Sequence, residues 1–309
     1  MTVTILFAVP ALWDEFAAPL RTALARAGVN GALVPKADPA QVDYIVYAPA
    51  SPLQDFTPYT KTKAVLNLWA GVERIAGNPT LTQPLCRMVD PGLTMGMVEW
   101  VVGHTLRHHL GMDRHIVNPG HVWDATCPPL ARARPVTVLG MGALGSACAH
   151  ALKALNFPVT GWSRTAKTIP GIETLHGKDG LAAALARAAI LIALLPRTPD
   201  TENLLDAPRL AHLPRGAVIL NPGRGALIDD DALLAALDAG HIAHATLDVF
   251  RTEPLPQDHR YWTHPRVTVT PHIAADTRPD SAARVIAENI ARGEAGLAFL
   301  HLVDRARGY

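Results

Sequence analysis

The sequence is poor in cysteine and contains no long hydrophobic run. Its three cysteines, Cys86, Cys127 and Cys148, form no C-x-x-C pair, so neither a zinc knuckle nor a disulfide framework is expected. The longest apolar run, residues 188–195, is far shorter than the ~18 residues of a membrane span. No basic segment precedes the apolar residues 2–12, which favours a first β-strand over a signal peptide. We therefore expect a cytoplasmic protein without a membrane anchor or a metal site.

An excess of charge of either sign is also missing. The chain has 28 basic and 27 acidic residues, a net charge of +1, and its charged share of 18 % is below the usual ~25 %. Such a balance provides no long-range field to attract nucleic acid or an anionic membrane. Any anion site must be local, and its ligand small. Apolar residues make up 49 %, which favours a folded protein, and 309 residues predict two domains at about 150 residues each.

Short apolar segments alternate with helical patterns, especially beyond residue 135. This alternation predicts a parallel α/β sheet covered by helices on both faces. The expected strands cover residues 2–8, 43–47, 64–68, 136–139, 159–162, 190–194, 216–220, 243–247 and 267–269. The expected helices cover residues 12–27, 95–115, 144–155, 180–187, 229–239 and 279–299. Gly240 is expected to follow the C-terminus of the helix 229–239, and the segment 119–135 to be a connector.

A glycine motif opens the second of these regions. Gly140-Met141-Gly142-Ala143-Leu144-Gly145 has the pattern G-x-G-x-x-G, directly after the expected strand 136–139 and at the start of a helix. That context is typical of a dinucleotide site: the first glycine permits a tight turn, the second a close approach of the pyrophosphate, and the third close helix packing. A tight turn without a ligand is the alternative.

The next strand bears on the choice of coenzyme. NAD-binding folds place Asp or Glu about 20 residues after the glycines to bind the ribose 2′-hydroxyl. Here Ser163, Arg164 and Thr165 follow the strand instead, and Lys167 adds charge. Hydroxyl groups and a guanidinium suit a 2′-phosphate, so NADP(H) is the preferred coenzyme, with NAD(H) possible. A solvated arginine on a turn is the alternative.

Three polar residues follow three later strands. Arg224 lies in Asn-Pro-Gly-Arg-Gly, Glu253 in the segment 248–256, and His272 in Thr-Pro-His-Ile-Ala-Ala. Parallel sheets place active sites at these strand ends. His272 is the candidate proton donor, because imidazole exchanges protons near neutral pH. Glu253 would orient the imidazole and favour its charged form, and Arg224 would pair with a substrate carboxylate.

With these residues in place, the chain resembles the D-isomer-specific 2-hydroxyacid dehydrogenases, and within them the glyoxylate/hydroxypyruvate reductase A branch. The segments that carry the resemblance are 70–73, 140–145, 161–164, 194–196, 198–201, 221–225, 248–256, 270–275, 277–279 and 303–309. The resemblance implies two Rossmann-like domains with doubly wound parallel sheets. The dinucleotide domain, residues 97–276, would be inserted into a split substrate domain made of residues 1–96 and a C-terminal part, residues 277–309. The site would lie in the cleft, and a homodimer would use the helix 95–115.

The resemblance also implies further site residues. Backbone amides around Ala70, Gly71 and Val72 would bind the substrate carboxylate. Leu195, Pro196 and Thr201 would line the path of the coenzyme, and Asp248 would bind the nicotinamide carboxamide, next to His272. Two positions depart from the branch: Tyr47 stands where it usually has Trp, and Trp69 where it usually has a small residue. Tyr47 would stand beside the site and bears on the side-chain preference, whereas the indole of Trp69 would either narrow the pocket or pack in the core.

The predicted function is the NAD(P)H-dependent reduction of a small 2-oxo acid, glyoxylate to glycolate or hydroxypyruvate to D-glycerate. One alternative is an NAD-dependent dehydrogenase of another 2-hydroxyacid, such as a phosphoglycerate. The missing acidic residue near Ser163 argues against it, and we also expect no regulatory domain in a chain that ends at Tyr309. A second alternative is a non-catalytic nucleotide-sensing protein on the same scaffold. A methyltransferase would not explain Glu253 and His272.

Overall fold

The computed structural model describes residues 2–305 and residue 308. The other residues of the expected C-terminal motif, Ala306, Arg307 and Tyr309, lie outside the described part. The chain divides into two compact units, Met1–Leu93 with Asp276–Tyr309, and Thr94–Ala275. The first unit therefore contains both ends of the chain.

The first unit is built on a five-stranded sheet in the order β2-β1-β3-β4-β5, in which every pair is parallel. Its elements are β1 (Val3–Phe7), η1 (Pro10–Leu12), α1 (Trp13–Arg26), β2 (Gly31–Val34), η2 (Pro39–Gln41), β3 (Tyr44–Tyr47), β4 (Ala64–Asn67), β5 (Leu85–Cys86), the start of α2 (Pro91–Leu110), and α8 (Pro279–Glu294).

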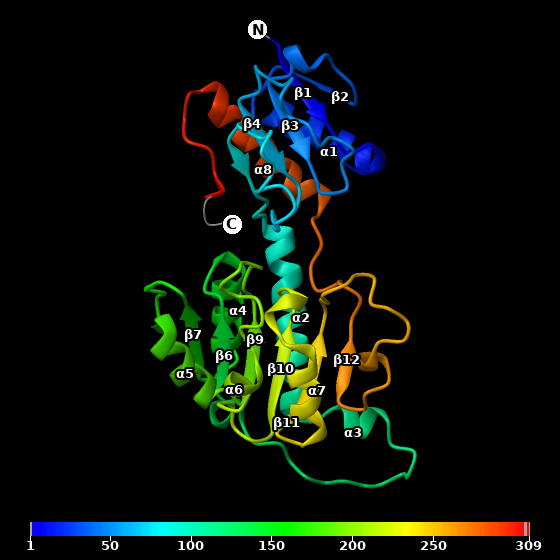
Figure 1. Cartoon of the computed structure of the whole chain (residues 1–309), viewed down its shortest axis with the longest axis vertical. Helices are drawn as coiled ribbons and strands as arrows, with labels where there is room; N and C mark the ends of the chain where they lie inside the picture. The colour runs from blue at the N-terminus through cyan, green and yellow to red at the C-terminus, as the bar shows by residue number, and fades with distance from the viewer. Residues whose placement is uncertain (1, 306–307, 309) are drawn as a thin grey trace. The chain divides into compact units, whose positions relative to one another are not determined.

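The C-terminal helix α8 belongs to this first unit because its apolar face packs with α1. The two helices lie side by side (Figure 1) and bury Phe16 and Leu20 of α1 with Ile286 and Ile290 of α8 in one core, under alternate residues of β1. The opposite face of the sheet is covered mainly by the segments between residues 51 and 81, in a second core around Phe56.

The second unit is built on a seven-stranded parallel sheet in the order β12-β11-β10-β9-β6-β7-β8. Besides the rest of α2 its elements are α3 (Asp113–Ile116), η3 (Ala131–Ala133), β6 (Val136–Leu139), α4 (Ala143–Ala154), β7 (Val159–Ser163), β8 (Glu173–His176), α5 (Gly177–Arg187), β9 (Ile190–Ala193), α6 (Ala207–Leu210), β10 (Ala217–Asn221), η4 (Gly225–Leu227), α7 (Asp230–Asp238), β11 (Ile242–Leu247), η5 (Arg260–Trp262) and β12 (Val267–Val269).

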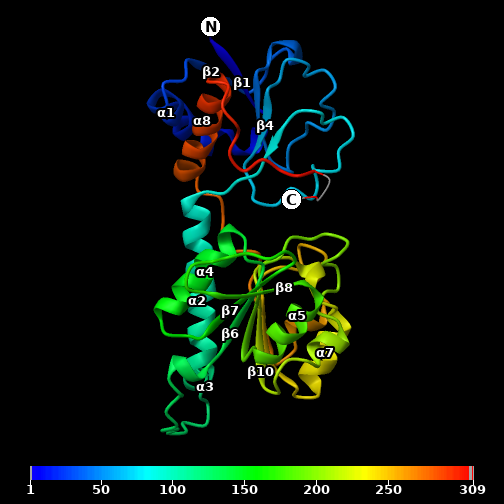
Figure 2. The same ribbon diagram turned by 90° about the vertical axis from the view of Figure 1, so that its left-hand side faces the viewer.

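Helices cover both faces of this sheet, with α2 and α4 on one face and α5 and α7 on the other (Figure 2). The central strand β9 is apolar throughout because both of its faces are buried. Ile190 and Ile192 pack in the core with α2 and α4, while Leu191 and Ala193 pack in the core with α5 and α7. A strand buried on both faces has no polar side to expose. The predicted α/β class with two parallel sheets is confirmed.

Several element bounds differ from the expected ones. Three strands were not predicted: β2, β5 and β8, which have four, two and four residues and lie at or next to the sheet edges. The last helix ends at Glu294 rather than at 299, close to Gly296, which adopts a positive φ of 68°. The helix expected at 95–115 begins at Pro91 and ends at Leu110, because Gly111 takes φ 63° and α3 follows separately. A glycine in the left-handed region commonly ends a helix.

Within the described residues, no helix is both long enough and apolar enough to cross a membrane.

Four histidines, of which His109 is buried and His104, His108 and His244 are half-buried, gather where α2 meets the sheet of the second unit. His108 forms a 2.8 Å hydrogen bond between its Nε2 and Thr246 Oγ1, and its ring lies 4.9 Å from that of His244. Burial lowers the pKa of His108 to about 3 and that of His244 to about 4, and neighbouring positive groups act in the same direction. Burial also lowers the pKa of His104 and His109. These rings are therefore neutral in the folded protein.

We expect the second unit to lose stability on acidification. In the unfolded chain a histidine takes up a proton near pH 6.5, whereas the folded protein holds His108 and His244 neutral, so the free energy of unfolding falls as the pH drops from about 6.5 towards 4. Each histidine contributes at most about 1.4 kcal/mol per pH unit. Urea unfolding at pH 7.5, 6.0 and 5.0 measures the slope, which His108→Gln should make shallower. The exposed His212→Gln is the control. An equal slope in His108→Gln and the wild type would contradict the explanation.

Candidate active site

The strand order of the second unit reverses between β6 and β9. From β6 the sheet runs to β7 and β8 on one side and to β9, β10, β11 and β12 on the other. The loops that follow β6 and β9 therefore leave the same edge of the sheet at adjacent strands. Ligands of open parallel sheets bind at this switch point. The loops concerned are residues 140–145 and 194–201.

The glycine loop after β6 is shaped by close backbone contacts. Gly140 has φ 104°, and a Cβ atom there would clash with the carbonyl of Leu194. A Cβ atom on Gly145 would clash with the Gly140 carbonyl, so α4 can start this close to β6 only with glycine. A Cβ atom on Gly142 would meet nothing within 4 Å.

The start of α4 is open to a ligand. Gly142 is the N-cap residue and provides no side-chain hydrogen bond to the first turn, where Ala143 is exposed and Leu144 is half-buried. The first amide groups of a helix attract anions. The side chain of Met141 is buried against Gly161 of β7 and so anchors the glycine loop to the sheet. These residues fit the pyrophosphate of a dinucleotide, which their amide groups would bind.

Two cations lie beside this loop, after β7. The Nη1 atom of Arg164 lies 3.3 Å from Asp200 Oδ2, and both side chains are exposed. The Nζ atom of Lys167 donates a 2.9 Å hydrogen bond to the carbonyl of Met141 in the glycine loop. Ser163 is buried, and its hydroxyl donates a 2.8 Å hydrogen bond to the carbonyl of the exposed Thr165. The segment predicted to bind the 2′-phosphate, residues 163–167, therefore combines the buried hydroxyl of Ser163 with the accessible positive charge of Arg164.

The loop after β9 forms a turn closed by Thr201. Its hydroxyl donates a 2.7 Å hydrogen bond to the carbonyl of Pro196 and accepts a 2.8 Å one from the amide of Thr198. Leu195 is buried beneath this turn. The three residues expected along the coenzyme path thus belong to a single structured turn.

Arg224 lies in the loop that follows β10, and the sequence did not predict what shapes this loop. The buried Asn221 shapes it, because its side-chain amide donates a 3.0 Å hydrogen bond to the Arg224 carbonyl and its oxygen accepts a 3.1 Å one from the Gly223 amide. Gly225 packs directly against the backbone of Phe250, where a Cβ atom would clash. A polar residue ending a fully apolar strand, as Asn221 does, was the available signal in the sequence.

Glu253 and His272 are in direct contact. Glu253 Oε2 lies 2.7 Å from His272 Nδ1, and its Oε1 atom accepts a 2.8 Å hydrogen bond from the Phe250 amide. Because an ionised carboxylate only accepts, Nδ1 carries the proton and Nε2 is left to face other groups. His272 has a φ of 56°, which is rare for a residue other than glycine and clusters at functional sites.

Asp248 holds the loop that carries His272. Its buried carboxylate accepts hydrogen bonds of 2.6 Å from the Thr270 hydroxyl, 2.9 Å from the Ile273 amide and 3.0 Å from the Ala274 amide. Its backbone carbonyl accepts a 2.8 Å bond from the His272 amide. These bonds fix the positive φ of His272. A contact between Asp248 and the coenzyme stays a prediction.

The remaining predicted residues lie in the first unit. Tyr47 is buried at the end of β3, with its ring centroid 5.7 Å from that of Phe56, and burial raises its pKa. Trp69 is 40 % exposed, Ala70 and Gly71 are half-buried, and Val72 is buried. This turn is held from the inside by Asn67, whose side-chain amide donates to the carbonyls of Trp69 (2.8 Å) and Gly71 (3.0 Å). Asn67 was not among the residues predicted from the sequence.

Comparison with protein families identifies residues 102–274 as a D-isomer specific 2-hydroxyacid dehydrogenase NAD binding domain. The matched segment contains the glycine loop, Arg224, Glu253 and His272.

Solved structures are similar along the whole chain. A D-isomer specific 2-hydroxyacid dehydrogenase from Xanthobacter autotrophicus, in complex with NADPH, is 37 % identical, with 99 % of each chain covered and a TM-score of 0.92. An NADPH-dependent glyoxylate/hydroxypyruvate reductase from Sinorhizobium meliloti, in complex with NADP, is 35 % identical, with 100 % of this chain and 99 % of that one covered and a TM-score of 0.85. A probable 2-hydroxyacid dehydrogenase from Rhizobium etli, in complex with NADP, is 32 % identical with the same coverage and a TM-score of 0.87.

Two alanine substitutions in the glycine loop separate ligand binding from packing. We expect Gly142→Ala to leave the thermal midpoint nearly unchanged, since its methyl group meets no protein atom, but to weaken dinucleotide binding by at least about tenfold. Gly145→Ala should instead destabilise the protein, because its methyl group clashes with the Gly140 carbonyl. Thermal unfolding and coenzyme fluorescence titration measure the two effects. Unchanged dinucleotide affinity in Gly142→Ala would refute the assignment of this loop.

Proposed function

The chain belongs to the D-isomer specific 2-hydroxyacid dehydrogenase family, and from this premise we propose that it is an NADPH-preferring reductase of small 2-oxo acids, with glyoxylate and hydroxypyruvate as the leading substrates. The observation that carries the proposal is the 2.7 Å contact between His272 Nδ1 and Glu253 Oε2 at the carboxyl edge of the sheet. A histidine oriented by a carboxylate is a group suited to general acid–base catalysis.

The proton step follows from this contact. A nicotinamide coenzyme, when bound, would provide the hydride that the keto carbon accepts. His272, in its charged form, gives the proton on Nε2 to the keto oxygen, so the carbonyl group gains one hydride and one proton and becomes an alcohol. Nδ1 keeps its proton and its hydrogen bond to Glu253, and the imidazole ends neutral. Glu253 stabilises the charged ring before the transfer and fixes its orientation throughout.

Arg224 would hold the substrate carboxylate. A guanidinium presents two parallel donors to a carboxylate and so fixes the orientation of a small acid. The Asn221 bonds and the close packing of Gly225 hold the backbone of its loop in place. The same charge polarises the keto oxygen and favours the charge that develops there.

The coenzyme preference rests on the end of β7. No carboxylate stands at residues 163–165, where an NAD site places one for the ribose 2′-hydroxyl. Arg164 provides an accessible guanidinium instead, with Lys167 nearby along the chain. The relatives from Xanthobacter, Sinorhizobium and Rhizobium are described with NADPH or NADP, which supports the same preference.

Homodimer formation stays a prediction for this chain. The end of α3 and the segment from there to η3 carry large apolar side chains that are exposed in the single chain, namely Ile116, Val117, Val122, Trp123 and Leu130. Exposed apolar patches of this kind are commonly covered by a partner.

Steady-state kinetics with glyoxylate, hydroxypyruvate and pyruvate test the activity. We expect NADPH oxidation with at least one of these acids, and we expect His272→Ala to lower kcat by a factor of about 10²–10⁴ while it still binds NADPH, because only the proton donor is lost. Fluorescence titration of NADPH shows that the variant is folded and binds the coenzyme. Wild-type protein inactive with all three acids would refute the proposed activity, and full turnover in His272→Ala would exclude this histidine as the acid.

Opposite substitutions in the Arg164–Asp200 pair test the coenzyme preference. Arg164→Ala removes the guanidinium and should raise the KM for NADPH by about 10–100-fold, with little effect on NADH. Asp200→Asn removes a carboxylate that competes for Arg164, so it should lower the KM for NADPH by a small factor. The ratio of kcat/KM for the two coenzymes is the measurement. A wild-type ratio of one or below would be incompatible with NADPH preference.

A further inference from the structure

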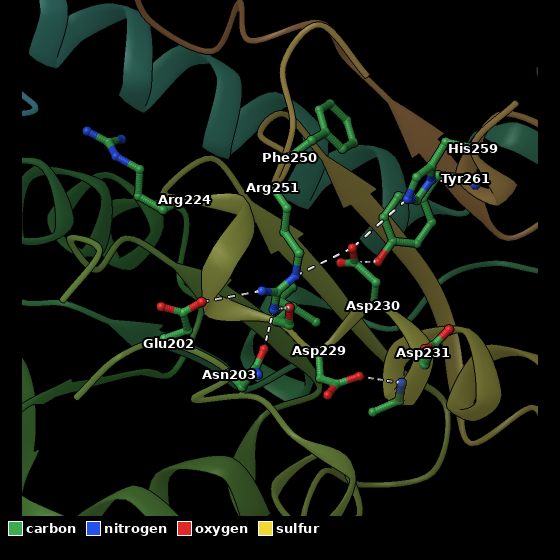
Figure 3. Close-up of polar contacts among 12 residues, drawn as sticks. Glu202, Asn203, Arg224, Asp229, Asp230, Asp231, Phe250, Arg251, His259 and Tyr261 are labelled. Atoms are coloured by element: carbon green, nitrogen blue, oxygen red, sulfur yellow. Dashed lines mark hydrogen bonds and ion pairs between the residues drawn. The ribbon is translucent and has the colours of Figure 1, made fainter. Parts of the chain in front are cut away.

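Arg251 lies two residues before Glu253 and binds segments of the second unit that are distant in sequence. Figure 3 shows its guanidinium between the loop after β9 and the start of α7. It donates hydrogen bonds to Asn203 Oδ1 and to the Ile228 carbonyl. Its Nη1 atom lies 3.7 Å from Glu202 Oε1 and its Nε atom 3.5 Å from Asp230 Oδ2. One planar group therefore contacts the loop after β9 and the segment that follows η4.

One of the two acidic partners of Arg251, Asp230, is itself anchored. Asp230 accepts a 2.9 Å hydrogen bond from the hydroxyl of the buried Tyr261, and His259 Nε2 lies 4.0 Å from its other oxygen (Figure 3). The ring of Tyr261 packs against that of Phe250, with 6.3 Å between centroids. The chain of contacts from Arg251 through Asp230 and Tyr261 thus returns to Phe250, so it starts and ends on the same turn, residues 250–253.

That turn presents Glu253 to His272. The Phe250 amide donates the 2.8 Å hydrogen bond that holds Glu253 Oε1, while Gly225, next to Arg224, packs against the Phe250 backbone from another side. Asn203, a partner of Arg251, is also tied to the Arg224 loop, since its amide donates a 2.8 Å hydrogen bond to the Ala226 carbonyl. A shift of this turn would therefore move Glu253.

Glu253 depends on the turn because its own side chain is weakly confined. The side chain of Glu253 is 34 % exposed and that of His272 is 52 % exposed, so water competes for their hydrogen bond. The Phe250 amide, which also holds the carboxylate, belongs to the same turn. The orientation of Glu253 is thus set by the stiffness of residues 250–253. Displacements of about 1 Å in such groups cost up to ~10²-fold in rate.

We propose that Arg251 is a positioning residue of the reaction: by binding Asp230, Ile228 and Asn203 it fixes the turn 250–253 and so keeps Glu253 on His272. This inference rests on the proposed reductase function only for its kinetic consequence. It assigns Arg251 no contact with substrate or coenzyme. An arginine suits this place because its planar guanidinium spreads five donors in a fixed geometry over three nitrogens, whereas the three donors of a lysine share one nitrogen.

The kinetic test uses Arg251→Gln and the neighbouring Arg260→Gln as a matched control. Arg260 makes exposed ion pairs with Asp231 (3.7 Å) and Asp238 (3.8 Å). We expect Arg251→Gln to lower kcat for the 2-oxo acid about tenfold with NADPH affinity within twofold of the wild type, and Arg260→Gln to leave both unchanged. In a Glu253→Gln background, Arg251→Gln should have no further effect on kcat, because the two residues act through one contact. Additive losses would overturn the proposal.

A spectroscopic measurement tests the same contact without turnover. In protein labelled with ¹⁵N-histidine, the His272 Nδ1–H proton resonance, assigned by its loss in His272→Gln, reports the hydrogen bond to Glu253. We expect it to move upfield or to broaden through exchange with water in Arg251→Gln, and also in Asp230→Asn, which serves if the first variant does not fold. An unchanged resonance in the folded variant would overturn the proposal. If the wild type reduces no 2-oxo acid, the proposed function fails, and this resonance alone decides the role of Arg251.

Discussion

Parallel pairing of β10, β11 and β12 is the constraint on which the site of the second unit depends. Because these strands run in one direction, the segments that follow them all leave the same edge of the sheet. Arg224, Glu253 and His272 are far apart in the sequence, yet each lies in the segment after one of these strands. The strand order adds the glycine loop after β6 and the turn after β9 to the same edge. The fold thus brings the residues of the candidate site to one edge of the sheet.

Buried polar side chains then turn this edge into a defined geometry. Asp248 binds three donors of the segment 270–274, and Asn221 binds two backbone groups of the Arg224 loop. Both are buried at the ends of apolar strands, where an unpaired polar group would be costly, so the loops must satisfy them. In this way the partly exposed side chain of His272 is carried by a segment that the buried Asp248 holds in place. The side chain of Glu253, which is also partly exposed, contacts His272. Arg251 extends the same logic to the turn that carries Glu253.

Charge in this protein acts at short range. The net charge of +1 leaves no field over the whole surface, and the cations that we propose as anion-binding groups lie at separate strand ends, Arg164 at the end of β7 and Arg224 after β10. The histidines between α2 and the sheet show the opposite case, since burial keeps them neutral and lowers the pKa of His108 and His244. A chain with 14 histidines therefore uses them in different ways according to their burial.

The sequence by itself determined the α/β class, the glycine loop and the family, because these depend on local patterns: short apolar strands, glycines at fixed spacing, and short polar motifs. It also singled out Glu253 and His272, whose contact the structure shows. It could not find the edge strand β8, which is half exposed and lacks an apolar pattern, nor the supporting roles of Asn67, Asn221 and Arg251. Asn67 and Asn221 bond backbone groups two to four residues further along the chain, so their roles depend on the exact conformation of the turn that follows each strand. Arg251 bonds groups 23 and 48 residues away. The tertiary structure alone decided this last role, because only folding brings those distant segments within hydrogen-bond distance.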